Sequence, residues 1–188
     1  MLKSVLGKVL GATFAALLMV TGAGQSIAGE AAVIDDKVNT ALKVLYDGNE
    51  VAQKLGKDAK AIMVFPDIVK AGAIVGGQYG KGAMRDQNNK TTGYYSTLAA
   101  SYGLQLGVQK FGYAMFLMND EAVRHAEAAN GWEIGTGPSI VVLDKGAATD
   151  FTTKSYKDDI YVYFFDQSGL MAGLGIQGTK VSKIDPDD

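Results

Sequence analysis

The sequence predicts an α+β fold: a strongly curved, glycine-rich antiparallel sheet, barrel-like or a sandwich, with N-terminal helices packed on it. Residues 31–60 place apolar side chains three and four positions apart, as on one face of a helix. From Ala61 onwards the pattern changes to short apolar or alternating runs separated by turn residues, which is typical of strands. The chain also has 24 glycines in 188 residues, many of them inside those runs.

The first 28 residues are predicted to be a removable secretory signal. Lys3 and Lys8 supply the positive start, residues 9–20 are apolar or small, and Ser26-Ile27-Ala28 provides small residues for cleavage. A membrane anchor is the alternative, but the apolar stretch is shorter than the roughly 20 residues that span a bilayer. We therefore expect a single domain over residues 29–188, periplasmic or secreted. Because there is no cysteine, it would carry no lipid-modified N-terminus.

Residues 31–60 are expected to form amphipathic helices that pack on the sheet. The first apolar stripe contains Ile34, Val38, Ala41, Leu42 and Leu45. Asp47-Gly48 interrupts it, and a second set follows with Val51, Ala52 and Leu55. A membrane-facing helix is the alternative, although such helices are usually richer in basic and aromatic residues.

Strands are expected along most of the remaining chain. Residues 61–65 form a buried strand ended by Pro66, and residues 71–85 and 91–104 form a hairpin around the polar loop 86–90. Residues 102–109 alternate in polarity, as expected of a half-buried strand with one polar face. Residues 113–118 are apolar on both faces, which favours a central place in the sheet.

The C-terminal third is expected to contain one helix and three more strands. The helix covers residues 121–129, capped by Asn119 or Asp120, and a strand covers residues 139–143. Runs at 160–165 and 170–177 are joined by residues 166–169, a hairpin signal. The acidic end, residues 185–188, is expected to fray.

Glycines four apart should lie on one face of a strand, because side chains alternate with a period of two. Gly72, Gly76 and Gly80 have this spacing, as do Gly103 and Gly107. A column without side chains allows another element to approach closely or the sheet to bend. These columns are the reason for expecting strong curvature.

Composition and motifs argue against several functional classes. The formal net charge of −2 becomes −4 when Lys3 and Lys8 leave with the signal, which is no signature of nucleic-acid binding. The glycines of residues 173–178 match a dinucleotide fingerprint, but too little chain follows to build the helix that it needs. His125 is the only histidine, and we expect it at an exposed helix position. No catalytic residues, metal site or cofactor are predicted.

Several separated motifs resemble the SYLF domain family. They are residues 65–72, continuing through Gly76-Gly77 to Gly80 and Gly82, then Tyr95-Ser96, Gly103, residues 107–109, residues 119–123 and residues 168–173. The similarity covers about residues 35–183. The resemblance implies a lipid-binding module, with actin binding in some eukaryotic members and exported proteins in the bacterial branch.

The function expected from this resemblance is non-catalytic binding of a phospholipid membrane surface. Lys54, Lys57, Lys60 and Lys70 lie beside apolar segments and are the candidate lipid-binding residues. A structural or protein-interaction domain of the envelope, with an envelope protein as partner, is the alternative. A hydrolase with an unrecognised site is the weakest of the three hypotheses.

Overall fold

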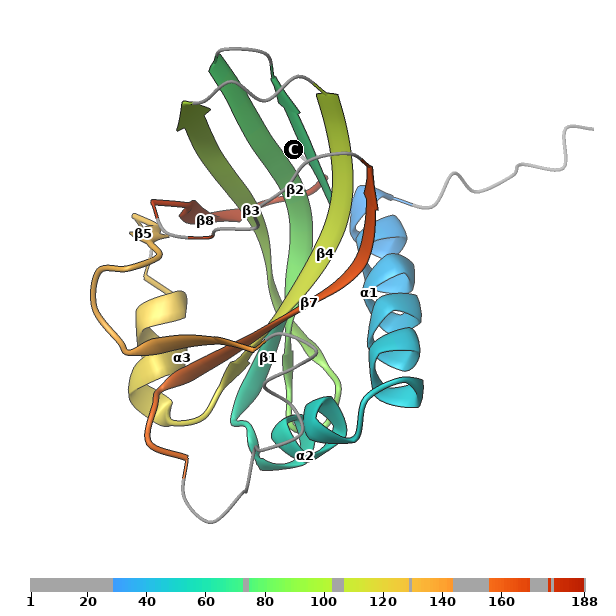
Figure 1. Ribbon diagram of the computed structural model, residues 1–188. Coiled ribbons are helices and arrows are strands. Elements are labelled where there is room, and N and C mark those ends of the chain that lie inside the picture. The colour runs from blue at the N-terminus through green and yellow to red at the C-terminus, as the bar shows by residue number, and fades with distance from the viewer. Residues whose placement is uncertain are drawn as a thin grey trace, which may run out of the picture.

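The computed structural model describes residues 29–72, 75–102, 107–128, 130–143, 156–169, 176 and 178–187. Within them the fold is α+β, and a mixed sheet curls into a half-barrel (Figure 1). The helices are α1 (Glu30–Asp47), α2 (Glu50–Asp58) and α3 (Asp120–Ala126). The strands are β1 (Ala61–Gly72), β2 (Val75–Asp86), β3 (Thr91–Tyr102), β4 (Gly107–Leu117), β5 (Trp132–Glu133), β6 (Ile140–Leu143), β7 (Ile160–Gly169) and β8 (Lys180–Ile184).

The strands follow the order β5-β8-β3-β2-β1-β4-β7-β6 across the sheet. Strand β4 lies between β1 and β7, which confirms the central position predicted for residues 113–118. Every described pair is antiparallel except β6 with β7, which is parallel, so the sheet is mixed. The predicted fold class is confirmed with this one qualification.

Helices α1 and α2 pack on the outer face of the sheet, as the sequence predicts. The buried residues of α1 are the predicted stripe Ile34, Val38, Ala41, Leu42 and Leu45. The break at Gly48 separates it from α2, whose cap is Asn49: its Oδ1 accepts a hydrogen bond from the amide of Ala52 at 2.9 Å. Together the helices cover Ile62, Val64 and Phe116 of the sheet.

The other face of the sheet encloses a second core, in which several aromatic rings pack among aliphatic side chains. Phe65 and Tyr113 have ring centroids 5.0 Å apart, and Phe164 lies 5.8 Å from Tyr113. Helix α3 closes this side with Ala122 and Ala126. The amide of Ala122 donates to Asn119 Oδ1 at 2.8 Å, which confirms Asn119 as the cap of this helix.

A bulge in β1 sets the curvature of the sheet. The register of β1 shifts between Phe65 and Ile68, where Pro66 occupies a position that needs no ladder hydrogen bond. On the neighbouring strand β2, a Cβ atom at Gly82 would lie 2.0 Å from the carbonyl oxygen of Val64. On β4, one at Gly112 would lie 2.9 Å from the carbonyl oxygen of Pro66. Glycine is therefore required where these strands approach.

The predicted boundaries around this bulge were wrong. Pro66 does not end the first strand, which continues to Gly72, and Ala71 and Gly72 belong to β1 rather than to the next strand. Gly72 of β1 pairs across strands with Gly76 of β2, so the two glycines do not lie on one face of a single strand as predicted. Gly103, in the second predicted column, lies outside the described residues.

The predicted hairpin at residues 160–177 was also wrong. Residues 166–169 continue β7, and Ser168 and Gly169 pair with Lys110 and Gln109 of β4. Asp166 adopts a positive φ of 50°, so the polar residues make an irregularity inside the strand instead of a turn. Apart from Ile176, residues 170–177 lie outside the described residues, and the last strand, β8, pairs with β3.

The end of the chain packs beside the start of α1. Asp187 Oδ1 accepts a hydrogen bond from the amide of Ala31 at 3.4 Å, and Pro186 is buried. The described part of the acidic tail is therefore held in place, contrary to the expectation that it frays.

Arg85 fastens α1 to the sheet through a partly buried ion pair. Its side chain is 7 % exposed, and its Nη2 lies 3.1 Å from Asp35 Oδ1. The same guanidinium donates to Asn39 Oδ1 at 3.1 Å and to Thr91 Oγ1 at 2.6 Å. Asp35 in turn accepts hydrogen bonds from Thr91 and Tyr94.

Replacing Arg85 by alanine should lower the free energy of unfolding by about 3 kcal/mol, because Asp35 would lose its charged partner in a partly buried site. Urea denaturation followed by circular dichroism measures this loss. Lys43→Ala, which removes an exposed pair with Asp47, should change the free energy of unfolding far less, because water screens that pair. Equal losses for the two variants would contradict the importance assigned to Arg85.

Gly82→Ala should destabilise the protein by about 1–3 kcal/mol or prevent folding, because the added methyl group would overlap the backbone of β1. Thermal unfolding of this variant should be compared with that of Gly77→Ala, where the nearest atom to an added Cβ is 3.5 Å away. A Gly82 variant as stable as the Gly77 variant would show that the strands do not need this close approach.

Candidate functional site

The outer face of the sheet carries apolar side chains that the described helices do not cover, near the end of β1 and the start of β4. Two rows of cross-strand neighbours make up what we call the outer apolar face. They are Leu98, Tyr79, Val69 and Lys110 in one row, and Ala100, Gly77, Ala71 and Val108 in the next. In Figure 1 the ends of β2, β3 and β4 that carry these rows extend beyond α1.

These side chains are exposed to an unusual degree for their type. Val69 is 41 % exposed, Leu98 54 % and Val108 60 %. Lys110 is the only charged residue in the two rows, and it is exposed. A sheet face in contact with water normally carries polar side chains, so this composition favours an apolar partner.

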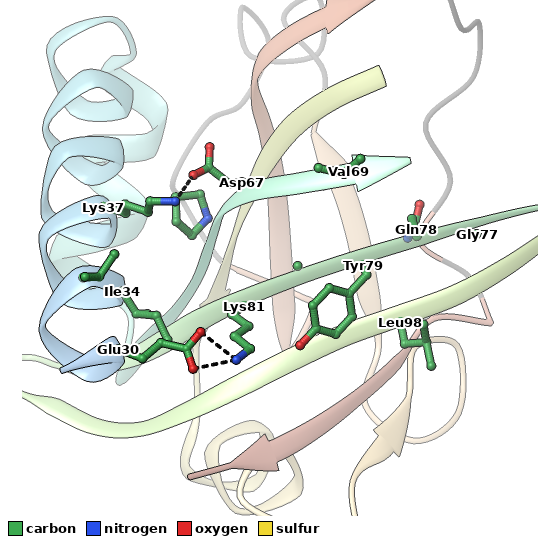
Figure 2. A pocket seen from close by; sticks show the side chains of 13 residues that line it. Glu30, Ile34, Lys37, Asp67, Val69, Gly77, Gln78, Tyr79, Lys81 and Leu98 are labelled. Atoms are coloured by element: carbon green, nitrogen blue, oxygen red, sulfur yellow. Dashed lines mark hydrogen bonds and ion pairs between the residues drawn. The ribbon is translucent and has the colours of Figure 1, made fainter. Parts of the chain in front are cut away.

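A groove runs between this face and the N-terminal half of α1 (Figure 2). Its volume is about 520 Å³. Ile34 of α1 lies on one side, and Val69, Tyr79 and Leu98 of the sheet lie on the other. Val33 of α1 also lines the groove. The groove is therefore an apolar hollow continuous with the outer apolar face.

Two ion pairs connect α1 to the strands at the groove. Lys37 Nζ lies 2.7 Å from Asp67 Oδ2, and Lys81 Nζ lies 2.7 Å from both carboxylate oxygens of Glu30 (Figure 2). The hydrogen bond with Glu30 raises the pKa of Lys81 above its ordinary value, so this ammonium group stays charged at neutral pH. The groove thus combines apolar walls with cations already balanced by carboxylates.

The four lysines selected from the sequence do not form one patch. Lys54 and Lys57 are exposed on α2, and Lys60 is exposed where the chain enters β1. Lys70 lies ten residues further along β1, about 30 Å away for an extended strand. It is 9 % exposed and shares the inner face with Ile68, so it faces the interior of the half-barrel.

Lys70 lies in a polar row on that inner face. Its cross-strand neighbours are Gln78 of β2 and Gln109 of β4, which are 5 % and 4 % exposed. Gln78 Nε2 donates to Thr179 Oγ1 at 3.3 Å. Sequence spacing missed this row because it depends on the register between strands.

No catalytic arrangement forms within the described residues. They contain no group of three histidine or acidic side chains placed to hold a metal ion. Asp159 accepts hydrogen bonds from Asn119 and Ser139, which lower the pKa of its carboxyl group and fix it in a structural role.

His125 occupies a different environment from the one expected. It is half-buried and packs edge-on against Trp132 with ring centroids 5.2 Å apart, so the expectation of an exposed position was wrong. Its Nε2 is buried close to Gly137. Trp132 of β5 and the loop that follows β5 fold back over the histidine, which helical spacing alone does not reveal.

None of the described helices combines the length and apolar character that crossing a bilayer requires.

One family model matches the chain, over residues 98–187. Its description is Ysc84: Las17-binding protein actin regulator. The match begins at Leu98, inside β3, and ends after β8, so it includes Leu98 and Val108 of the outer apolar face. No curated protein matches the chain.

Proposed function

Because the chain belongs to the SYLF domain family, we propose that it is an exported, non-catalytic module that binds phospholipid at a membrane surface. The family is one of binding domains, which supports lipids or actin-related proteins as partners in general. The predicted signal at residues 1–28 supports export, and an exported module would meet glycerophospholipid membranes.

The outer apolar face is the observation that carries this proposal. Moving apolar surface out of water contributes roughly 25 cal/mol per Å², so partial burial of Leu98, Tyr79 and Val108 in a membrane would be favourable. Lys110 lies among them and would remain at the level of the phosphates, where one lysine contributes about 1 kcal/mol on an anionic membrane. Because the two rows of the outer apolar face contain one cation and no carboxylate, their charge is complementary to an anionic lipid surface.

The lysines at the other end of α1 are a second proposed contact. Lys54, Lys57 and Lys60 are exposed, but Asp58 lies in the same segment and accepts a hydrogen bond from Tyr156 at 2.6 Å. Among the residues that the structure describes, this end of the molecule has no uncovered apolar rows comparable to those on β1–β4. We therefore assign the main contact to the outer apolar face.

A structural or protein-interaction domain is the alternative function, and the same face would then contact an envelope protein. Lipid and protein partners differ in how binding responds to vesicle composition. Co-sedimentation of residues 29–188 with vesicles of varied anionic lipid content separates them. If the protein binds no vesicle of any composition, the result would favour a protein as the partner of the outer apolar face.

Leu98→Asp combined with Val108→Asp should weaken binding to anionic phospholipid vesicles at least tenfold, because two apolar contacts are lost and two repulsive charges are added. Vesicle co-sedimentation measures the change. The matched control replaces Val44 and Val142, which are 49 % and 46 % exposed but lie elsewhere, by aspartate. Equal weakening by both double variants would remove the outer apolar face from the proposal.

Lys110→Glu should lower the affinity for anionic vesicles about tenfold at low salt, and the difference should shrink as salt screens the charge. Lys90→Glu, in the hairpin between β2 and β3, makes the same change in net charge and should have little effect. A variant in which Lys54, Lys57 and Lys60 are all replaced by glutamate reverses the charge at the second contact and tests it. Unchanged binding by that variant would exclude this contact, and unchanged binding by Lys110→Glu would exclude the first.

A further inference from the structure

We propose that the groove beside α1 holds a single acyl chain of an anionic amphiphile, so that the module binds individual lipid molecules as well as a membrane surface. The inference rests on the proposed lipid-binding function and specifies its ligand. The two surfaces then have different roles. The outer apolar face contacts the bilayer, and the groove binds one acyl chain of a lipid from that bilayer.

The shape of the groove supports a chain-like ligand. A volume of about 520 Å³ lies within the roughly 300–1,000 Å³ that is typical of small-molecule sites. The walls come from different layers of the fold, Val33 and Ile34 from α1 and Val69 and Tyr79 from the sheet. A bilayer cannot reach side chains on both walls of a hollow at once, whereas an inserted chain can contact both.

Gly77 keeps the floor of the groove open. It lies on the outer face between Ala71 and Ala100, beside Tyr79. An added Cβ would meet only the carbonyl oxygen of Ala99, at an ordinary 3.5 Å. The backbone therefore tolerates a side chain here, and that side chain would project into the groove.

The charged groups at the groove favour an anionic headgroup. Lys81 is held by Glu30, the first residue of α1, and both side chains keep contact with solvent, at 33 % and 45 % exposure. Ion pairs exposed to water contribute little stability, so an incoming carboxylate or phosphate can replace Glu30. Lys81 would then bind the headgroup while the chain lies along Val69 and Leu98.

The first test is calorimetric titration of residues 29–188 with saturated fatty acids of 8 to 14 carbons, kept below their micellar concentrations. Affinity should rise about fourfold for each methylene group that enters the groove, then stop rising when the groove is full. Gly77→Leu should weaken this binding at least tenfold. Gly48→Leu is the matched control, because Gly48 also meets one backbone oxygen at 3.5 Å but lies at the far end of α1.

Vesicle binding by the unmodified protein separates this inference from the general function. Saturable fatty-acid binding should accompany vesicle binding in that protein, and the effect of Gly77→Leu is judged on fatty acids alone, because Gly77 belongs to both the groove and the outer apolar face. Unchanged fatty-acid affinity in Gly77→Leu, or no saturable fatty-acid binding while vesicle binding persists, would overturn the acyl-chain site and leave the surface function intact. Loss of both kinds of binding in the unmodified protein would overturn both.

The second test addresses the headgroup. Glu30→Gln removes the carboxylate that competes for Lys81, so the affinity for a fatty acid should rise several-fold while that for the alcohol of equal chain length stays constant. Asp47→Asn, which removes the partner of Lys43 outside the groove, is the control. Equal changes for acid and alcohol would overturn the assignment of Lys81 to the headgroup.

Discussion

The half-barrel depends on the close approach of β1, β2 and β4 around the bulge at Pro66. Carbonyl oxygens of β1 lie where side chains at Gly82 and Gly112 would otherwise be. This contact allows a sheet of strands up to 12 residues long to curl and so to present two different faces. The inner face closes on a hydrophobic core under α3, and the outer face receives α1 and α2. The groove exists because these strands continue past the part of the sheet that α1 covers.

Length explains why the outer face remains partly uncovered. Twelve strand residues extend about 40 Å, whereas the 18 residues of α1 extend about 27 Å. The helix is fastened near the hairpin between β2 and β3, where Arg85 and Asp35 pair. The excess strand length therefore lies at the other end, and the apolar character of Leu98 and Val108 there has no packing role within the described residues. This mismatch leaves the surface available for the binding role proposed for it.

The sequence predicts the fold class and the helices well because both depend on local patterns. The stripe from Ile34 to Leu45 is the buried face of α1, and Asn119 is the cap of α3. Features that depend on pairing between distant strands were missed. Pro66 and Asp166 look like turn residues, yet both lie inside strands because the register of neighbouring strands tolerates an irregularity there. Lys70 resembles its neighbours in sequence, but an inward position in β1 separates it from Lys60. The outer apolar face likewise becomes visible only when four strands are aligned.

The contact between Asp187 and the first turn of α1 places both ends of residues 29–187 beside the mouth of the groove, since Glu30 lines it. A purification tag or fluorescent label attached at either end would therefore stand next to the surface under study. The hairpin between β2 and β3 lies at the opposite end, where Gln87 donates to the carbonyl oxygen of Ala59 at 3.2 Å. Labels for binding experiments are better attached there. The same geometry means that any tether joined to either end would orient the groove towards whatever holds the tether.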